Sequence, residues 1–290
     1  VPSNIAPLNF HYTSCGIRKA KTTVMFNDFV MTFSGKEVVW DIQEWRKLLK
    51  SAENDTLRFV SEIILKGGKE ENVEWEIYVS EDKIDPYMTY RLIEPGYEVW
   101  HEVEIRERCL ESYDERIISD WRNTANSCMN CHIHTQARAD LSMFYVRGKH
   151  GGAFLNRDGE LRKLSLKTDE MISGTVYGEV HPSGRYGVFS SNIIIPGFHT
   201  QGSRRLEVYD TKSDLVIADF DMNEMTVPQS LSRKDVLETF PVFSADGKHI
   251  YYCSADTLSL PQEVTKLRYS LMKVTFDEST GKVGNHPEVV

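Results

Sequence analysis

Two segments in the second half of the chain repeat one another, and this repeat constrains the fold more than any other feature. Residues 180–190 align with residues 243–253, with Gly184 and Gly247 in register. In each copy an apolar run leads into a Ser/Asp-Gly turn and a second apolar run leaves it, which predicts a pair of antiparallel strands. Further along, residues 215–221 match residues 271–277 as another strand followed by an acidic turn.

The period of this repeat predicts a β-propeller. It spans roughly 55–65 residues, against ~40–50 for common propeller blades, so we expect inserted loops. Repetition of four-stranded antiparallel units is the pattern of a propeller. Residues 143–290 supply one partial unit and two clear ones, whereas closure takes about four to eight blades. We therefore expect a partial propeller over residues 143–290. The favoured explanation is that the missing blades lie beyond the C-terminal residue, and the alternative is that a second chain completes the ring.

Residues 1–110 are expected to form a β-rich domain with one short helix. Strands are predicted over residues 23–33, 57–65 and 73–79, the last two joined by a hairpin turn at Gly67-Gly68. Asp41 stands three residues before Glu44 and ahead of an apolar stripe, which predicts the N-terminus of a helix.

Two segments connect this domain to the repeats. Residues 84–97 are rich in aromatic side chains but contain Pro86 and Pro95, which favours a loop laid over an apolar surface. Ser112 and Glu115 have capping-box spacing, which predicts a helix over residues 112–121. We therefore expect a short helical junction over residues 111–142.

The junction contains the sequence Cys128-Met129-Asn130-Cys131-His132. Cys-x-x-Cys-His is the attachment pattern of a c-type haem. In such a site both cysteines form thioethers with the vinyl groups of the porphyrin, and the histidine ligates the iron. The pattern predicts one covalent haem c, bound by Cys128 and Cys131, with His132 as the proximal iron ligand. Protein expressed without haem-attachment machinery would lack it.

Two other interpretations of this motif remain open. It could be half of a four-ligand zinc site, which needs two further Cys or His at compatible spacing; the remaining cysteines, Cys15, Cys109 and Cys253, are isolated in the sequence. It could also be a redox dithiol, which normally lies at a helix N-terminus after a strand. Here the pair follows the end of an expected helix.

The second axial position of the iron has two candidates. Met143 lies 11 residues beyond His132 and His150 lies 18 beyond it, far enough for the chain to return across the ring. His134 is only two residues away and cannot reach the opposite face without severe strain. Arg91, in the aromatic segment, is a candidate to bind a haem propionate by a charge-assisted hydrogen bond. The more common outcome for such a segment is that it closes a domain interface, with its arginine solvated or paired.

Composition limits the classes of function. The net charge of −9 argues against a nucleic-acid partner. The content of 40% apolar and 27% charged residues is that of a soluble globular protein. No apolar stretch approaches the ~18 residues of a membrane-spanning helix. No nucleophile–base pair or carboxylate pair stands out, so we assign no catalytic residue.

The chain begins at Val1 with neither an initiator Met nor a signal peptide, so we expect a mature or trimmed product. Haem c is attached outside the cytoplasm. The haem prediction therefore implies an exported, periplasmic protein, with membrane anchoring through a removed N-terminal segment as one option.

The sequence also resembles a known family. Residues 240–252 look like the repeat of TolB-like β-propellers, whose blades carry a Pro-x-Phe-Ser-x-Asp-Gly-Lys stretch. The whole chain more closely resembles exported Bacteroidetes proteins labelled TolB-like or cytochrome c biosynthesis proteins. In those proteins, segments like residues 4–10 and 90–97 precede a Cys-x-x-Cys-His motif and a propeller. The resemblance covers nearly all 290 residues.

This resemblance implies that Cys128, Cys131 and His132 form the haem site. Several relatives have a histidine where Tyr145 stands, so a distal ligand at that position would be missing here. We expect an N-terminal β domain (1–110), the junction (111–142) and a partial propeller (143–290), serving electron transfer or redox sensing and binding an envelope protein at the propeller face. The alternative is a non-enzymatic interaction module of the cell envelope, in which the motif is unoccupied or structural.

Overall fold

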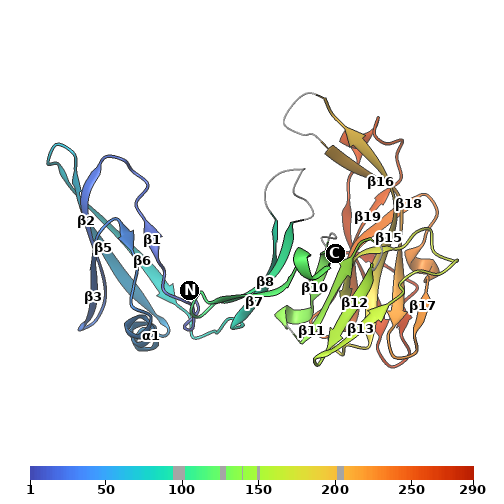
Figure 1. Cartoon of the computed structure of the whole chain (residues 1–290), viewed down its shortest axis with the longest axis horizontal. Coiled ribbons are helices and arrows are strands. Elements are labelled where there is room, and N and C mark those ends of the chain that lie inside the picture. Colours follow the sequence, from blue (N-terminus) through green and yellow to red (C-terminus); the bar gives the residue numbers. More distant parts are fainter. Residues whose placement is uncertain (94–101, 125–128, 139, 149–150, 201–205) are drawn as a thin grey trace. The chain divides into compact units, whose positions relative to one another are not determined.

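The computed structural model describes residues 1–93, 102–124, 129–138, 140–148, 151–200 and 206–290 (Figure 1). The chain divides into two compact units. The first comprises Val1–Tyr90 and Arg106–Arg116, and the second comprises Arg91–Ile105 and Ile117–Val290. Antiparallel strands dominate both, which confirms the prediction of a mainly β chain.

The first unit is built on a four-stranded antiparallel sheet of order β3-β2-β5-β6, with β1 and β4 paired separately. Its strands are β1 Phe10–His11, β2 Ile17–Phe26, β3 Phe29–Ser34, β4 Glu37–Val38, β5 Asp55–Leu65 and β6 Glu70–Val79. Along β5, buried and less buried side chains alternate, as expected for a sheet covered on one face.

Helix α1, Ile42–Ser51, covers this face of the sheet (Figure 1). Asp41 is its N-cap, accepting hydrogen bonds from the backbone N–H groups of Gln43 and Glu44, which confirms the predicted start. Trp45, Leu48 and Leu49 are fully buried in the core cluster that the helix shares with β5. The Trp45 indole N–H donates to the carbonyl of Ile5 at 3.1 Å.

The prediction of hairpin strands over residues 57–65 and 73–79 is confirmed by β5 and β6, and Gly67 and Gly68 adopt positive φ in the turn between them. The prediction of one continuous strand over residues 23–33 is wrong. Asn27 adopts φ of 48° and turns the chain between β2 and β3. Asparagine enters the left-handed region more readily than other non-glycine residues, so it interrupts a run that otherwise favours a strand.

Two predictions about the middle of the chain are also wrong. The expected loop contains strand β7, Tyr87–Ile93, which belongs to a three-stranded sheet of order β7-β8-β9 with β8 Val103–Cys109 and β9 Glu115–Asp120. Pro86 precedes β7, where its missing backbone N–H removes no hydrogen bond from the ladder. Pro95 lies outside the described residues.

The helix expected over residues 112–121 is instead strand β9, followed by a 3-10 turn over Trp121–Thr124. Ser112 does not cap a helix; its hydroxyl donates to Asp114 at 2.6 Å. Arg116 reaches from β9 to Glu107 on β8 with a 2.5 Å hydrogen bond. This pairing between strands overrides the local capping-box spacing.

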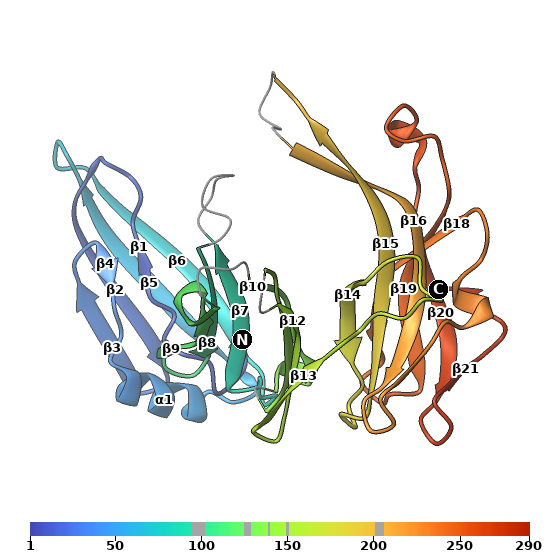
Figure 2. The same ribbon diagram turned by 45° about the vertical axis from the view of Figure 1, so that its right-hand side comes forward.

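The second unit contains three successive antiparallel meanders (Figure 2). The first meander consists of β10 Met129–His134, β11 Leu141–Val146, β12 Gly152–Arg157 and β13 Glu160–Leu164. The second consists of β14 Thr175–Val180, β15 Tyr186–Phe198, β16 Leu206–Asp219 and β17 Glu224–Thr226. The third consists of β18 Val236–Phe243, β19 His249–Asp256 and β20 Ser270–Asp277, with β21 Lys282–Val283 and β22 Glu288–Val289 both paired to β20.

The sequence repeat coincides with these strands. Residues 180–190 run from the end of β14 through a turn into β15, and residues 243–253 run in the same way from β18 into β19. Gly184 and Gly247 occupy equivalent turn positions with φ of 75° and 71°. The predicted strand pairs are therefore confirmed. The first two meanders have the four-strand order of a propeller blade, and in the third two short strands, β21 and β22, share the position after β20.

Side chains tie the first strands of the meanders together. The Thr135 hydroxyl, just beyond β10, donates to the carbonyl of Val180 on β14 at 2.7 Å. The Phe243 N–H on β18 donates to the Glu179 carboxylate on β14 at 2.7 Å. Two apolar clusters fill the space between the meanders, one between the first and second and the other between the second and third.

The turn at Gly247 is tightly packed, so we expect a side chain there to lower stability. A Cβ at Gly247 would fall well inside van der Waals contact with the His181 ring, and φ is positive. We expect Gly247→Ala to lower the free energy of unfolding by about 2–4 kcal/mol in urea titrations, from overpacking and backbone strain together. Gly159→Ala is the matched control, because Gly159 has φ of 86° with nothing within 4 Å; it should cost about 1 kcal/mol. Equal losses would contradict the steric argument.

The contribution of Glu179 to stability should depend on pH. Burial raises its pKa, and the hydrogen bond from Phe243 N–H partly opposes this. The folded state then keeps the proton to higher pH than the unfolded state, so this group's contribution to stability falls as pH rises above about 4.3. Glu179→Gln should therefore gain stability relative to wild type at pH 7 but not at pH 4, measured by urea unfolding. Glu160→Gln, at an exposed position at the start of β13, controls for the loss of a charge; an equal gain there would contradict the prediction.

Candidate functional site

The Cys-x-x-Cys-His motif enters strand β10. Cys131 and His132 belong to this strand, whereas Cys128 lies outside the described residues, as does the distal candidate His150. The motif therefore continues into a strand of the first meander, not into a helical junction.

The register of β10 changes at the motif. Asn130 is opposite Tyr145 on β11, and Ile133 is opposite Met143. Two residues of β10, Cys131 and His132, therefore face the single residue Phe144, which is the count of a β-bulge. A bulge releases its residues from strict alternation and re-aims a side chain, and bulges are common beside functional sites.

His132 is half-buried in this bulge. Burial lowers the pKa of its imidazole, and the positive charge of Arg91 lowers that pKa further. Both causes favour the neutral ring, which is the form that ligates a metal. The His134 ring lies beside it, with 5.6 Å between the ring centroids. His134 is the histidine that sequence reasoning ranked lowest as a ligand.

An apolar cluster lies around the start of β10. Met129, the first residue of the strand, is buried with Ile105 and Val146, and Phe144 and Phe154 pack against them. The two phenylalanine rings are stacked at 5.5 Å between centroids with an interplanar angle of 13°. The bulge therefore adjoins a nonpolar aromatic surface.

Met143, the other distal candidate, is placed in a different setting. It is 3% exposed and shares the core cluster between the first and second meanders with Ile133, the residue opposite it. Its thioether is used there for packing. The structure brings His132 together with His134 and the charge of Arg91, and keeps Met143 in the core.

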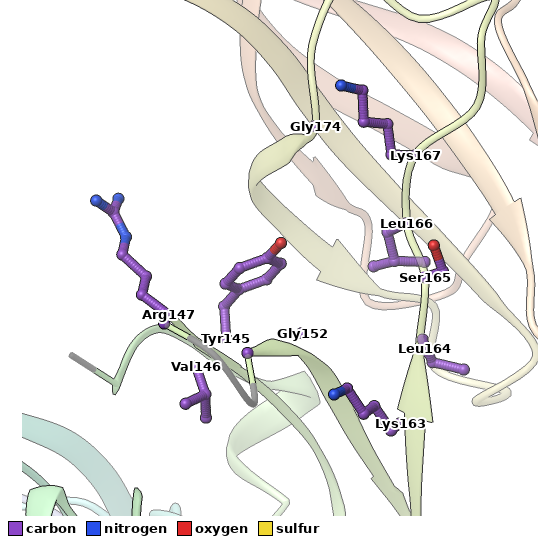
Figure 3. Close-up of a pocket in the computed structure, with 12 residues that line it drawn as sticks. Tyr145, Val146, Arg147, Gly152, Lys163, Leu164, Ser165, Leu166, Lys167 and Gly174 are labelled. Carbon is purple, nitrogen blue, oxygen red and sulfur yellow. The ribbon is translucent and has the colours of Figure 1, made fainter. Parts of the chain in front are cut away.

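A cavity that sequence reasoning missed lies at one end of the first meander (Figure 3). Its volume is about 550 Å³, and its lining includes three cationic side chains, Arg147, Lys163 and Lys167. Arg147 directly follows β11, Lys163 belongs to β13, and Lys167 lies in the segment after β13. In the sequence, the only sign of this cavity is the basic residues scattered over 147–167. Their spacing does not indicate a site, because only the sheet topology brings them together.

Over the ranges that the structure describes, no group of three or more His, Cys, Asp or Glu side chains is arranged to hold a metal ion. Among the same residues, no helix is long and apolar enough to span a membrane.

Three solved structures align with this chain at low sequence identity and low TM-score. No family model matches it, and no curated protein matches it. The tricorn protease aligns at 8% identity and a TM-score of 0.35, over 78% of this chain and 21% of that one. Oligogalacturonate lyase from Vibrio parahaemolyticus aligns at 12% and 0.34, over 78% and 61%. The WD40 domain of SCAP from fission yeast aligns at 12% and 0.30, over 82% and 59%.

This chain thus spans less than two thirds of the length of each of these structures.

The burial of Met143 generates a prediction about stability. Met143→Ala should lower the free energy of unfolding by about 2–5 kcal/mol, because it leaves a cavity in the core. Met143→Leu keeps the volume and should cost less than about 1.5 kcal/mol. Met222→Ala is the control, since Met222 is 60% exposed and should change stability by at most about 0.5 kcal/mol. A loss at Met222 as large as that at Met143 would contradict the assignment of Met143 to the core.

Proposed function

We propose that this chain is an exported protein that carries one covalent haem c at Cys128, Cys131 and His132 and uses it for electron transfer or redox sensing. The observation that carries the proposal is the β-bulge of β10, which falls on Cys131 and His132 and lies opposite Phe144.

The described residues fit such a group. The environment of His132 favours the neutral imidazole that iron ligation needs. Phe144 and Phe154 are partly buried and stacked beside the motif, packed against the buried cluster of Ile105, Met129 and Val146. Their rings supply nonpolar contact area, and a porphyrin is a large nonpolar ring. These features support the haem interpretation over a bare dithiol.

Each residue would have a distinct task. Cys128 and Cys131 would hold the porphyrin through thioethers, and His132 would bind the iron through a ring nitrogen. The haem would supply a site for one-electron oxidation and reduction. The Arg91 guanidinium would hold a propionate by a charge-assisted hydrogen bond. Its positive charge near His132 would also favour the reduced iron over the more positive oxidised iron.

The proposal also includes the distal iron ligand, the location of the protein and its partner. Met143 and His150 are the candidates for the distal position, and use of Met143 would require it to leave the core. Haem c attachment outside the cytoplasm places the protein in the periplasm or another exported location. We assign its partner to the cell envelope, bound at the propeller face.

Haem attachment is tested by co-expression with a haem-maturation system. We expect the wild-type chain to gain the mass of one haem, retained after denaturation and accompanied by a Soret band. Cys128→Ala with Cys131→Ala should abolish both. The matched control is Cys109→Ala with Cys253→Ala, which removes the same number of thiols from β8 and β19 and should leave attachment intact. Retention of covalent haem by the Cys128/Cys131 double variant would overturn the proposal.

A second candidate function is a haem-free interaction module. It is favoured by the long hairpin of β15 and β16, which extends beyond the rest of the second meander (Figure 2). Ile194, Ile195 and Val208 are exposed on it, and Phe198 is 69% exposed. Exposed apolar groups gathered on one element are typical of protein contact surfaces. A folded wild-type chain with no Soret band after maturation would select this function.

A further inference from the structure

The cavity at the end of the first meander differs from the rest of the protein in its charge. Its lining includes Arg147, Lys163 and Lys167, and none of the described residues that line it is Asp or Glu. The chain as a whole has 43 acidic and 34 basic residues. A purely cationic lining in an acidic protein therefore needs an explanation.

Three arginines elsewhere in the same unit are neutralised by carboxylates. Arg157 pairs with Asp221, Arg185 with Asp219 and Arg233 with Glu238, each at 2.7 Å. Within the part of the chain that the structure describes, Arg147 and Lys167 have no such partner. Their charges reach the cavity uncompensated, and a concave surface lined by one sign of charge concentrates ions of the opposite sign.

The backbone makes room for these side chains. Gly152 begins β12, and a Cβ there would lie 2.7 Å from Cε of Lys163, so the Lys163 side chain in its present position lies directly over the glycine. Figure 3 shows Tyr145 projecting from β11 toward the segment that carries Ser165 and Lys167, with Arg147 beside it. Hydroxyl donors therefore accompany the cations.

We infer that this cavity binds a small organic anion bearing two or more negatively charged oxygens, as in an organic phosphate or a polycarboxylate. The arginine fork binds such oxygens in pairs, and the lysines and hydroxyl groups complete their hydrogen bonds. Val146, Leu164 and Leu166 give the wall a nonpolar part that suits a carbon skeleton. The volume of about 550 Å³ lies in the range of small-molecule sites.

The test uses pyrophosphate and citrate as probes, measured by isothermal titration calorimetry on the full chain at low ionic strength. We expect saturable binding that weakens as salt is added, because the interaction is charge-based. Arg147→Gln with Lys167→Gln should lower affinity at least tenfold. The control variant, Arg18→Gln with Lys19→Gln, also removes one arginine and one lysine charge, but from exposed positions on β2. It should change the affinity less than twofold.

Two results would overturn the inference. One is the absence of saturable binding of either probe to the wild-type chain. The other is an equal loss of affinity in both double variants, which would show that net charge and not the cavity attracts the anion. The titration is repeated on the Cys128→Ala/Cys131→Ala chain, so that anion binding is measured independently of haem attachment.

Discussion

The contact of His181 with the Gly247 turn joins the second and third meanders, and the arrangement of the second unit depends on it. The ring is 2% exposed. Its Nδ1 lies 2.8 Å from the Ser183 hydroxyl, and its Nε2 lies 3.1 Å from the carbonyl oxygen of Gly247. Phe243 and Phe276 pack around the ring. A single meander cannot bury both its faces, so a buried contact of this kind between neighbours makes the stack stable.

The parts of the fold that sequence reasoning predicts well are those set by local chemistry. The repeated strand pairs follow from turn glycines such as Gly184 and Gly247, and the start of α1 follows from the side chain of Asp41. The helix prediction for the segment around Ser112 was wrong, because the local helix pattern competes with an interaction between strands, the pairing of Arg116 with Glu107. Sequence spacing contains no information about which strand will lie alongside.

The same distinction holds for the candidate site. The motif names Cys131 and His132, but the bulge exists only because β11 offers a single residue, Phe144, against the two. The positive charge of Arg91 lowers the pKa of His132, but a contact of Arg91 with a haem propionate stays a prediction. The cationic cavity could not be foreseen, because Arg147 and Lys163 come together only when β11 and β13 flank β12.

Strand β11 connects these features, because its register decides what each of its residues faces. Met143 lies opposite Ile133 in the core, and Tyr145 lies opposite Asn130 and lines the cavity. Phe144, between them, packs with the cluster around Met129. Neighbouring residues of a strand point to opposite faces, so a slip of one residue would exchange Met143 with Phe144. The six pairs that β11 makes with β12 fix its register, and thereby fix both the bulge at His132 and the position of Arg147.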